Sequence, residues 1–376
     1  MQPFEIDISD EAINDLHRRL DHARLPPPSP AAAWQDGTDH DALVDLCHYW
    51  RDGFDWPSQQ HSLNQLPQLT TEIDGQRLHA VHTTSPEPDA IPLVLLHGWP
   101  GSFAEFRDIV RPLSDPRAHG DDPADAFHIV CPSLPGYTFS TPVNDPGWNH
   151  RRIAAAVDEL MRLLGYDKYG AQGGDWGSFI ARQIALQAPE RVTGIHLNLV
   201  VTPPPPDEEP AQMSEQERQA LADLDHYRQW GSAYVEIQST RPRTLGYALE
   251  DSPLGLAAWM FEKYREWSHG EVPGAISRDQ LLTNISLYWF TRSATSAARL
   301  YHEVRLADGP LSDQRVETPT GCAILPGEIF RPARRWVQPH YNVTHFSELP
   351  AGGHFAAMEV PKLLVEDIRS FFRPLR

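Results

Sequence analysis

One carboxylate lies where a chain of this pattern would carry a nucleophile. The segment GGDWGS, residues 173–178, falls between a predicted strand and a predicted helix, with Gly173 and Gly177 flanking Asp175. Gly-x-nucleophile-x-Gly is the form of a nucleophile elbow, a strained turn in which only glycine avoids clashes on either side. A carboxylate is already ionised at neutral pH and needs no base to activate it. We therefore expect Asp175 to attack an sp³ carbon and form an alkyl ester; simple capping of the helix is the structural alternative.

A second motif could supply the oxyanion hole for such an ester. HGWP, residues 97–100, directly follows the apolar run IPLVLL. In this arrangement, the loop after the strand gives one backbone donor and the residue after the nucleophile gives the other. The expected donors are the N–H groups of Trp99 and Trp176, since Pro100 has no N–H. A cis Trp99–Pro100 bond would aim the first donor, so we predict one. An ordinary strand-to-helix turn is the alternative.

A histidine near the C-terminus completes a candidate triad. His354 lies in GGHF, after the last predicted strand. In this class of hydrolase the chain order is nucleophile, acid, histidine, so an acid is needed at the end of an intervening strand. Glu328, in LPGE, meets that requirement. The poorer choices precede that strand or belong to the last one: Asp313, Glu317 and Glu348.

The elements around these motifs predict an α/β fold, with a mostly parallel sheet and helices on both faces. Before the alternating part, Ser9 caps a helix and a second helix covers residues 39–53. A hairpin follows, with strands 69–73 and 78–83 around Asp74-Gly75. The sequence then alternates between strands and helices: strands 91–96, 127–131, 169–172 and 192–201, and helices 102–113, 153–164 and 176–188.

A helical insertion interrupts this alternation after the sixth core strand. Four prolines at 203–206 predict a stiff connection into the insertion. The insertion, residues 207–315, is helical in pattern and rich in aromatics. Strands return at 322–325 and 343–346, before a final helix at 361–372. The predicted domains are an N-terminal helical extension that wraps the core, the first part of the core, a helical lid and the second part of the core: residues 1–66, 67–202, 203–316 and 317–376.

Composition excludes several function classes. With 32 Lys+Arg against 51 Asp+Glu, the formal net charge is −19, which disfavours nucleic acid and anionic membrane surfaces as partners. Three cysteines far apart give no disulfide framework and no zinc-finger spacing. There is no apolar run of about 18 residues, and the N-terminus lacks a secretory signal. We expect a cytoplasmic protein, and a homodimer is left open.

Longer motifs resemble one family, the microsomal-type epoxide hydrolases, which are α/β-hydrolases with an N-terminal extension and a helical lid. PFEIDIS and RLDHARLP resemble the extension, HGWPGSF, LPGYTFS and GGDWGS the core, SPLGLAAW and LLTNISLYWFT the lid, and GGHFAAME the histidine segment. Membrane-bound members carry an apolar anchor before the extension, and this chain starts within the extension. The resemblance thus implies a soluble member without the anchor.

The resemblance implies a role for each matched residue. Asp175 would be the nucleophile, Glu328 the acid and His354 the base, and two lid tyrosines, Tyr234 and Tyr301, would donate to the epoxide oxygen. The ester would then be hydrolysed by water that His354 activates, in the oxyanion hole, giving a vicinal diol. This chemistry requires neither a metal nor a cofactor. A biosynthetic role, for instance in antibiotic or other secondary metabolism, is as plausible as detoxification.

The lid composition favours an aryl or other bulky hydrophobic epoxide as partner. Most lid aromatics are expected in the core and some along a substrate slot: Tyr227, Trp230, Trp259, Phe261, Tyr264, Trp267, Tyr288, Trp289 and Phe290. Two other functions remain open. A haloalkane dehalogenase would use the same Asp nucleophile, with Trp99 and Trp176 available for halide. A non-catalytic small-molecule binding protein could share the scaffold.

Overall fold

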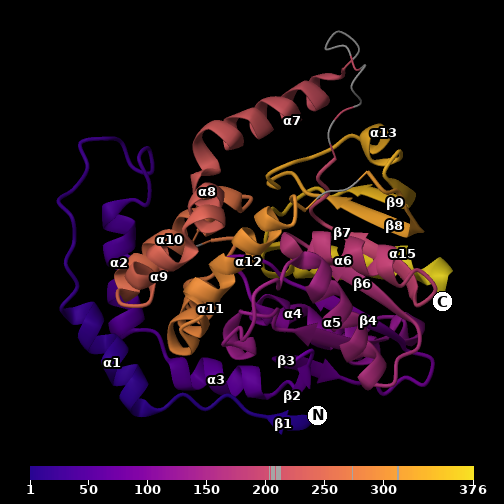
Figure 1. Cartoon of the computed structure of the whole chain (residues 1–376), viewed down its shortest axis with the longest axis horizontal. Coiled ribbons are helices and arrows are strands. Elements are labelled where there is room, and N and C mark those ends of the chain that lie inside the picture. The colour runs from indigo at the N-terminus through magenta and orange to yellow at the C-terminus, as the bar shows by residue number, and fades with distance from the viewer. Residues whose placement is uncertain (203, 205–207, 209–212, 273, 311–312) are drawn as a thin grey trace.

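The centre of the molecule is one twisted sheet. The computed structural model describes residues 1–202, 204, 208, 213–272, 274–310 and 313–376 (Figure 1). Within them the strands follow the order β1-β2-β3-β5-β4-β6-β7-β8-β9. The strands are β1 (Gln2–Phe4), β2 (Gln68–Ile73), β3 (Gln76–Thr83), β4 (Ile91–Leu96), β5 (Phe127–Pro132), β6 (Tyr169–Gly173), β7 (Val192–Leu197), β8 (Val316–Ile324) and β9 (Tyr341–Glu348).

Strand direction divides this sheet into an antiparallel edge and a parallel remainder. β1, β2, β3 and β5 pair antiparallel in that order, and every pair from β5 through β4 to β9 is parallel. The β2–β3 hairpin turns at Asp74 and Gly75 with φ of 52° and 71°, which confirms the predicted tight turn. In a parallel sheet the carboxyl ends of β4, β6 and β8 lie at one edge, so the loops that follow them can meet.

Helices cover the sheet, with α4 (Arg107–Ser114) packed on α15 (Pro361–Phe372) and α5 (His150–Leu163) packed on α6 (Trp176–Gln187). Glycines in the strands make room for α15. A Cβ at Gly170 would lie 2.4 Å from the Phe372 ring, and one at Gly321 would lie 2.8 Å from Phe371. The doubly covered α/β fold predicted from the sequence is therefore confirmed.

The insertion between β7 and β8 forms a helical lid over the carboxyl edge of the sheet (Figure 1). Its helices are α7 (Glu215–His226), α8 (Ala233–Thr240), α9 (Pro242–Leu249), α10 (Pro253–Trp267), α11 (Arg278–Thr291) and α12 (Ala294–Leu306). A single π-helical turn, Tyr227–Gly231, joins α7 to α8. Pro203, Pro205 and Pro206 lie outside the described residues, so the stiff proline connection stays a prediction.

The N-terminal extension contacts the lid as well as the core. It comprises β1, which joins the sheet, and the helices α1 (Asp10–Asp21), α2 (His40–Asp52) and α3 (Trp56–Asn64). As predicted, Ser9 caps α1 by accepting from the Ala12 N–H. Both α1 and α2 pack on α10, and the Trp50 indole N–H donates to Ser286 Oγ at 2.9 Å. The extension thus holds the lid helices by buried contacts, which the expectation of a wrap around the core did not include.

Several boundaries differ from the sequence-based expectation. The strand predicted over residues 192–201 ends at Leu197, level with Gly173 at the end of its neighbour β6. The strands predicted at 322–325 and 343–346 are longer, at 316–324 and 341–348. β1 and α3 were not predicted. Among the described residues, no helix is long and apolar enough to cross a membrane.

Candidate active site

Asp175 stands on a strained turn between β6 and α6. Its φ is 47°, in a region that residues with a side chain rarely adopt. A Cβ at Gly173 would lie 2.3 Å from the backbone of Gly177, and one at Gly177 would lie 1.9 Å from the Leu96 carbonyl oxygen. Both flanking glycines are therefore required by backbone contacts, and Asp175 makes no side-chain cap to α6. The elbow geometry is confirmed and the capping alternative is wrong.

His354 lies between two carboxylates. Its Nδ1 is 2.8 Å from Glu328 Oε1, and its Nε2 is 3.2 Å from Asp175 Oδ2. Glu328 lies in the loop after β8 and His354 in the loop after β9. The two loops meet where the Gly327 N–H donates to the Gly352 carbonyl. The structure therefore brings together all three residues that the sequence selected for a triad.

The charge on His354 depends on these neighbours. Burial alone would lower the pKa of the imidazole, but the charge of Glu328 and the contact with Asp175 together raise it well above 6.5. In the resting site the histidine is thus held as an imidazolium between its two carboxylates. Loss of the charge on Asp175 would remove part of that support and lower the pKa.

The other candidate acids lie away from the histidine. Glu317 is inside β8 rather than before it, and it pairs with Arg315 at the surface. Glu348 is the exposed last residue of β9, in the last strand as expected, and Asp313 is exposed. Of the four acids considered, Glu328 alone hydrogen-bonds to His354.

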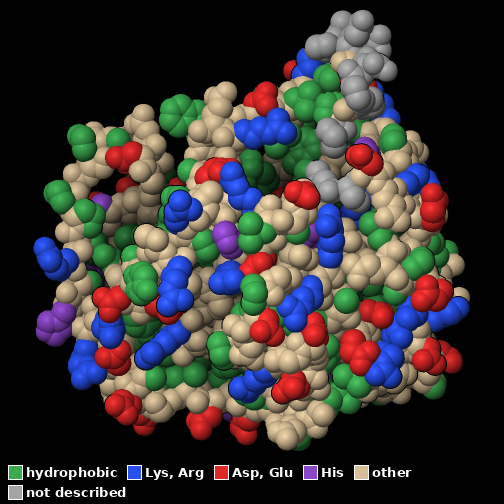
Figure 2. Space-filling model, viewed as in Figure 1, with side chains coloured by type: hydrophobic (Ala, Val, Ile, Leu, Met, Phe, Trp, Pro, Cys, Tyr) green, Lys and Arg blue, Asp and Glu red, His purple; other side chains and the backbone are tan. Residues whose placement is uncertain are grey.

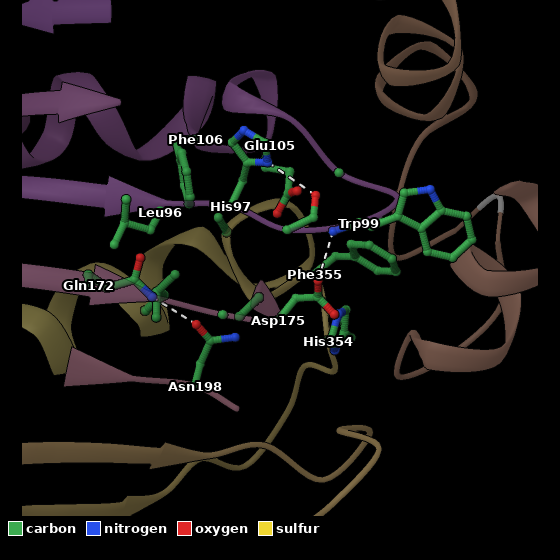
Figure 3. A pocket seen from close by; sticks show the side chains of 16 residues that line it. Leu96, His97, Trp99, Glu105, Phe106, Gln172, Asp175, Asn198, His354 and Phe355 are labelled. Atoms are coloured by element: carbon green, nitrogen blue, oxygen red, sulfur yellow. Dashed lines mark hydrogen bonds and ion pairs between the residues drawn. The ribbon is translucent and has the colours of Figure 1, made fainter. Parts of the chain in front are cut away.

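The loop after β4 places a donor on the nucleophile. The Trp99 N–H donates to Asp175 Oδ1 at 2.7 Å, and the Trp99–Pro100 bond is cis, as predicted. Gly98 is required here because a Cβ would lie 2.0 Å from the same oxygen. Trp176 follows Asp175 as the first residue of α6, but the structure shows no hydrogen bond from its N–H to Asp175. Its share in an oxyanion hole stays a prediction. Figure 3 shows Trp99, Asp175 and His354 converging from their separate loops.

The two lid tyrosines line one cavity with Asp175. Tyr234 on α8 stacks on the Trp99 indole with centroids 5.0 Å apart, and Tyr301 on α12 packs edge-on against Trp176 at 4.8 Å. The two phenol rings are 5.8 Å apart, and both line a cavity of about 580 Å³ together with Asp175. Tyrosines 67 positions apart in sequence are therefore neighbours, as the pairing of α8 with α12 requires.

Burial keeps these phenols protonated. It raises the pKa of both well above 10, and the nearby charge of Asp175 raises it further. A third tyrosine, Tyr227 in the π-helical turn, lies with its hydroxyl 3.0 Å from that of Tyr234. A protonated phenol beside a carboxylate can donate a hydrogen bond or a proton to an oxygen placed between them.

The remaining cavity wall is largely apolar. It includes core residues near the elbow and β7 as well as lid residues: Phe179, Leu199, Val201, Val235, Val304 and Phe330. Of the lid aromatics considered from sequence, Tyr227 lines this cavity. Trp230 is 77% exposed, and buried members such as Tyr264 and Tyr288 form the lid core.

Sequence reasoning named Tyr227 only as one of nine lid aromatics, some of which were expected along a substrate slot, and it did not consider Phe179 or Leu199. Phe179 comes one helical turn after Asp175, and Leu199 follows the end of β7. Their positions just past the elbow and past a strand end were the available signal. Tyr227 offered none, because a π-helical turn has no clear sequence mark.

Comparison with known proteins agrees with this geometry. Residues 1–106 match the family model described as epoxide hydrolase N terminus, and residues 91–239 match the α/β hydrolase fold. Epoxide hydrolase 1 of Sus scrofa is 37% identical over 99% of this chain and 88% of its own.

Two solved structures extend the likeness to three dimensions. Aspergillus niger epoxide hydrolase superposes with a TM-score of 0.90 at 34% identity, covering 100% of this chain and 96% of that one. Juvenile hormone epoxide hydrolase of Bombyx mori gives 0.88 at 29% identity, over 100% and 94%. The extension, core and lid are thus all shared, and the chain belongs to the epoxide hydrolase family.

Proposed function

We propose that this enzyme converts a bulky hydrophobic epoxide to a vicinal diol through an ester on Asp175. The observation that carries the proposal is that Asp175 and the pair Tyr234 and Tyr301 line one cavity. A carboxylate and two protonated phenols in one cavity suit an epoxide, whose opening needs a nucleophile at carbon and a proton at oxygen.

In the first step an oxygen of Asp175 attacks a ring carbon and the carbon–oxygen bond of the epoxide breaks. The resulting alkoxide takes a proton from Tyr234 or Tyr301, whose raised pKa values keep that proton available. The imidazolium of His354 balances the resting charge of Asp175 and Glu328 before attack.

In the second step His354 acts as a base on water. Esterification removes the charge of Asp175, which is one of the causes that raise the histidine pKa. The imidazolium then passes its proton more readily to the phenolate left by ring opening. The neutral imidazole can accept a proton from water, while Glu328 holds its orientation. Hydroxide attacks the carbonyl carbon, and the Trp99 N–H stabilises the oxyanion.

The cavity supports the substrate class. Its volume of about 580 Å³ and its aliphatic and aromatic walls suit a large apolar group better than a small polar one. Styrene oxide is therefore a suitable probe. A role in secondary metabolism remains an expectation from the sequence alone. The dehalogenase and binding-protein alternatives are disfavoured, because family membership and the paired phenols both favour epoxide opening.

Isotope labelling tests the ester. Enzyme in excess over styrene oxide is allowed one turnover in H₂¹⁸O. The first diol should contain only ¹⁶O, because its new oxygen comes from Asp175, and the peptide containing Asp175 should gain ¹⁸O. If the first diol carries the label and Asp175 does not, water attacks the epoxide directly and the proposed intermediate is wrong.

A further inference from the structure

A second, much smaller cavity also reaches Asp175, with walls that are otherwise separate from those of the substrate cavity. Its volume is about 20 Å³, enough for one water, which needs about 10–15 Å³. Among the described residues, Asp175 alone lines both cavities. Around the small one, polar side chains gather from four loops or strand ends: Glu105, Gln172, Asp175, Asn198 and His354. A polar space of this size between an ester carbon and its base suits a water rather than substrate.

Glu105 is the one carboxyl of this wall that the mechanism above does not use. It lies in the short 3₁₀ helix Phe103–Phe106, just before α4, and is only partly exposed. Its carboxyl occupies the space beside Gly101, where a Cβ would come within 1.3 Å of Glu105 Oε1. Figure 3 shows this carboxyl on the side of the cavity that faces Trp99 and Asp175. The glycine of HGWPG therefore leaves room for a carboxyl directed at the site.

We propose that the small cavity holds the water that hydrolyses the ester, and that Glu105 is the residue that positions it. The inference rests on the proposed function, because it assigns a residue to that function's second step. An ester whose alkyl group fills the large cavity leaves the small cavity for the attack. His354 lines the small cavity and can accept the proton.

The protonation of Glu105 fits this task. Burial raises its pKa to about 8, with His354 opposing and Asp175 adding to the shift. At neutral pH the carboxyl therefore mostly carries its proton and can both donate to and accept from a water. A neutral carboxyl also avoids a third negative charge beside Asp175 and Glu328.

The hydrolytic step balances as follows. One proton of the water passes to His354 Nε2 while the water oxygen bonds to Cγ of Asp175. The tetrahedral intermediate collapses with cleavage of the bond from Cγ to the alkyl oxygen, and that oxygen takes the proton from His354. The proton that His354 lost before this step restores the tyrosine that gave one in ring opening. The water's other proton leaves the regenerated carboxyl and returns His354 to the imidazolium of the resting site. Glu105 ends the cycle unchanged.

The test separates the two chemical steps in wild type, Glu105→Ala and Glu105→Gln. Rapid mixing with styrene oxide, followed by quenching and intact-protein mass spectrometry, gives the rates of ester formation and ester loss. Glu105→Ala should slow ester loss by about 10²-fold, the scale of a misplaced reactant, and leave ester formation near wild type. Glu105→Gln keeps a donor and an acceptor and should restore most of the rate.

Glu359→Gln is the matched control. Glu359 is another partly buried carboxyl with a raised pKa, and it accepts from the Phe355 N–H beside His354, but it does not line the small cavity. Its ratio of ester formation to ester loss should match wild type. If Glu105→Ala slows both steps equally or neither, or if Glu359→Gln changes the ratio as much, the inference is overturned. If wild type forms neither ester nor diol, the proposed function fails instead.

Discussion

The sheet and the lid hold their parts of the site in different ways. On the sheet side, backbone geometry does the holding: Asp175 sits at φ 47° and receives the Trp99 N–H at 2.7 Å. On the lid side, aromatic packing does it: Tyr234 stacks on Trp99 and Tyr301 packs edge-on against Trp176. The sheet thus fixes the atoms that form and break the ester, while the lid places phenols over them.

In the proposed mechanism, the two regions contribute differently to the two half-reactions. Residues of the sheet loops take part in both steps, whereas the lid tyrosines have a role only where the epoxide oxygen becomes charged. A variant in the lid should therefore affect ring opening, and a variant at the base should affect ester hydrolysis.

The largest effect is expected for His354→Gln. Ester hydrolysis should fall by about 10²–10⁴-fold, the usual contribution of a general base, while one round of ring opening persists. Intact-protein mass spectrometry should show the accumulated ester. As a control, His345→Gln removes a histidine that pairs instead with Asp367, and it should leave both rates unchanged. Loss of ring opening in folded His354→Gln protein would contradict the assignment of His354 to ester hydrolysis alone.

The next largest effect is expected for the lid phenols. Tyr234→Phe and Tyr301→Phe should each slow ring opening by about 10- to 100-fold, since a hydrogen bond to a charged oxygen contributes about 1.5–3 kcal/mol. The double variant should slow it much more, because one phenol partly covers for the other. Stopped-flow measurement of ester formation tests this, with exposed Tyr247→Phe as control. Normal ring opening in the double variant would favour a dehalogenase.

The two steps should also respond differently to pH. Hydrolysis needs neutral His354, so its rate should rise by up to about tenfold per pH unit until the pH exceeds the histidine pKa of the ester form. Ring opening needs protonated Tyr234 and Tyr301, whose raised pKa values keep it flat through the neutral range. Single-turnover rates between pH 5 and 9 measure both. Parallel profiles would mean that one group controls both steps.

The smallest effect is expected for Tyr227→Phe. Its hydroxyl contacts that of Tyr234 and orients it, and a neutral hydrogen bond contributes about 0.5–1.5 kcal/mol, or about 2- to 10-fold in ring opening. Trp230→Phe, in the same π-helical turn but exposed, is the control. A larger effect on ester hydrolysis than on ring opening would contradict the assignment of Tyr227 to the lid group that acts in ring opening.

The sheet side of the site could be predicted from the sequence because its backbone leaves few choices of residue. Gly173 and Gly177 avoid backbone contacts of about 2 Å, and Gly98 makes room for the nucleophile itself. Such requirements appear as glycines at fixed spacing. The acid was found from chain order, and Glu328 does bond to His354.

The lid side and the water cavity left weaker traces. Tyr234 and Tyr301 were found through a family resemblance, because from the sequence alone a tyrosine on a helix could equally be a buried core residue. A π-helical turn brings Tyr227 to the site. The Glu105 carboxyl fits beside the site because Gly101 has no side chain. One strand end was also misplaced, because β7 stops at Leu197, level with the end of β6. These features depend on contacts between distant segments, which no local pattern records.

The contacts between the N-terminal extension and the lid limit how chimaeras can be built within the family. The bonds that join these two regions include the Trp50 indole to Ser286, the Tyr49 hydroxyl to Asp279 at 2.8 Å, and the Thr38 hydroxyl to the Ala258 carbonyl at 2.7 Å. A lid grafted from a relative would bring its own halves of these pairs and meet foreign partners in the first 66 residues. Grafting the extension and the lid together keeps every pair native. The unit of exchange for altering substrate range is therefore two segments that are far apart in the chain and adjacent in space.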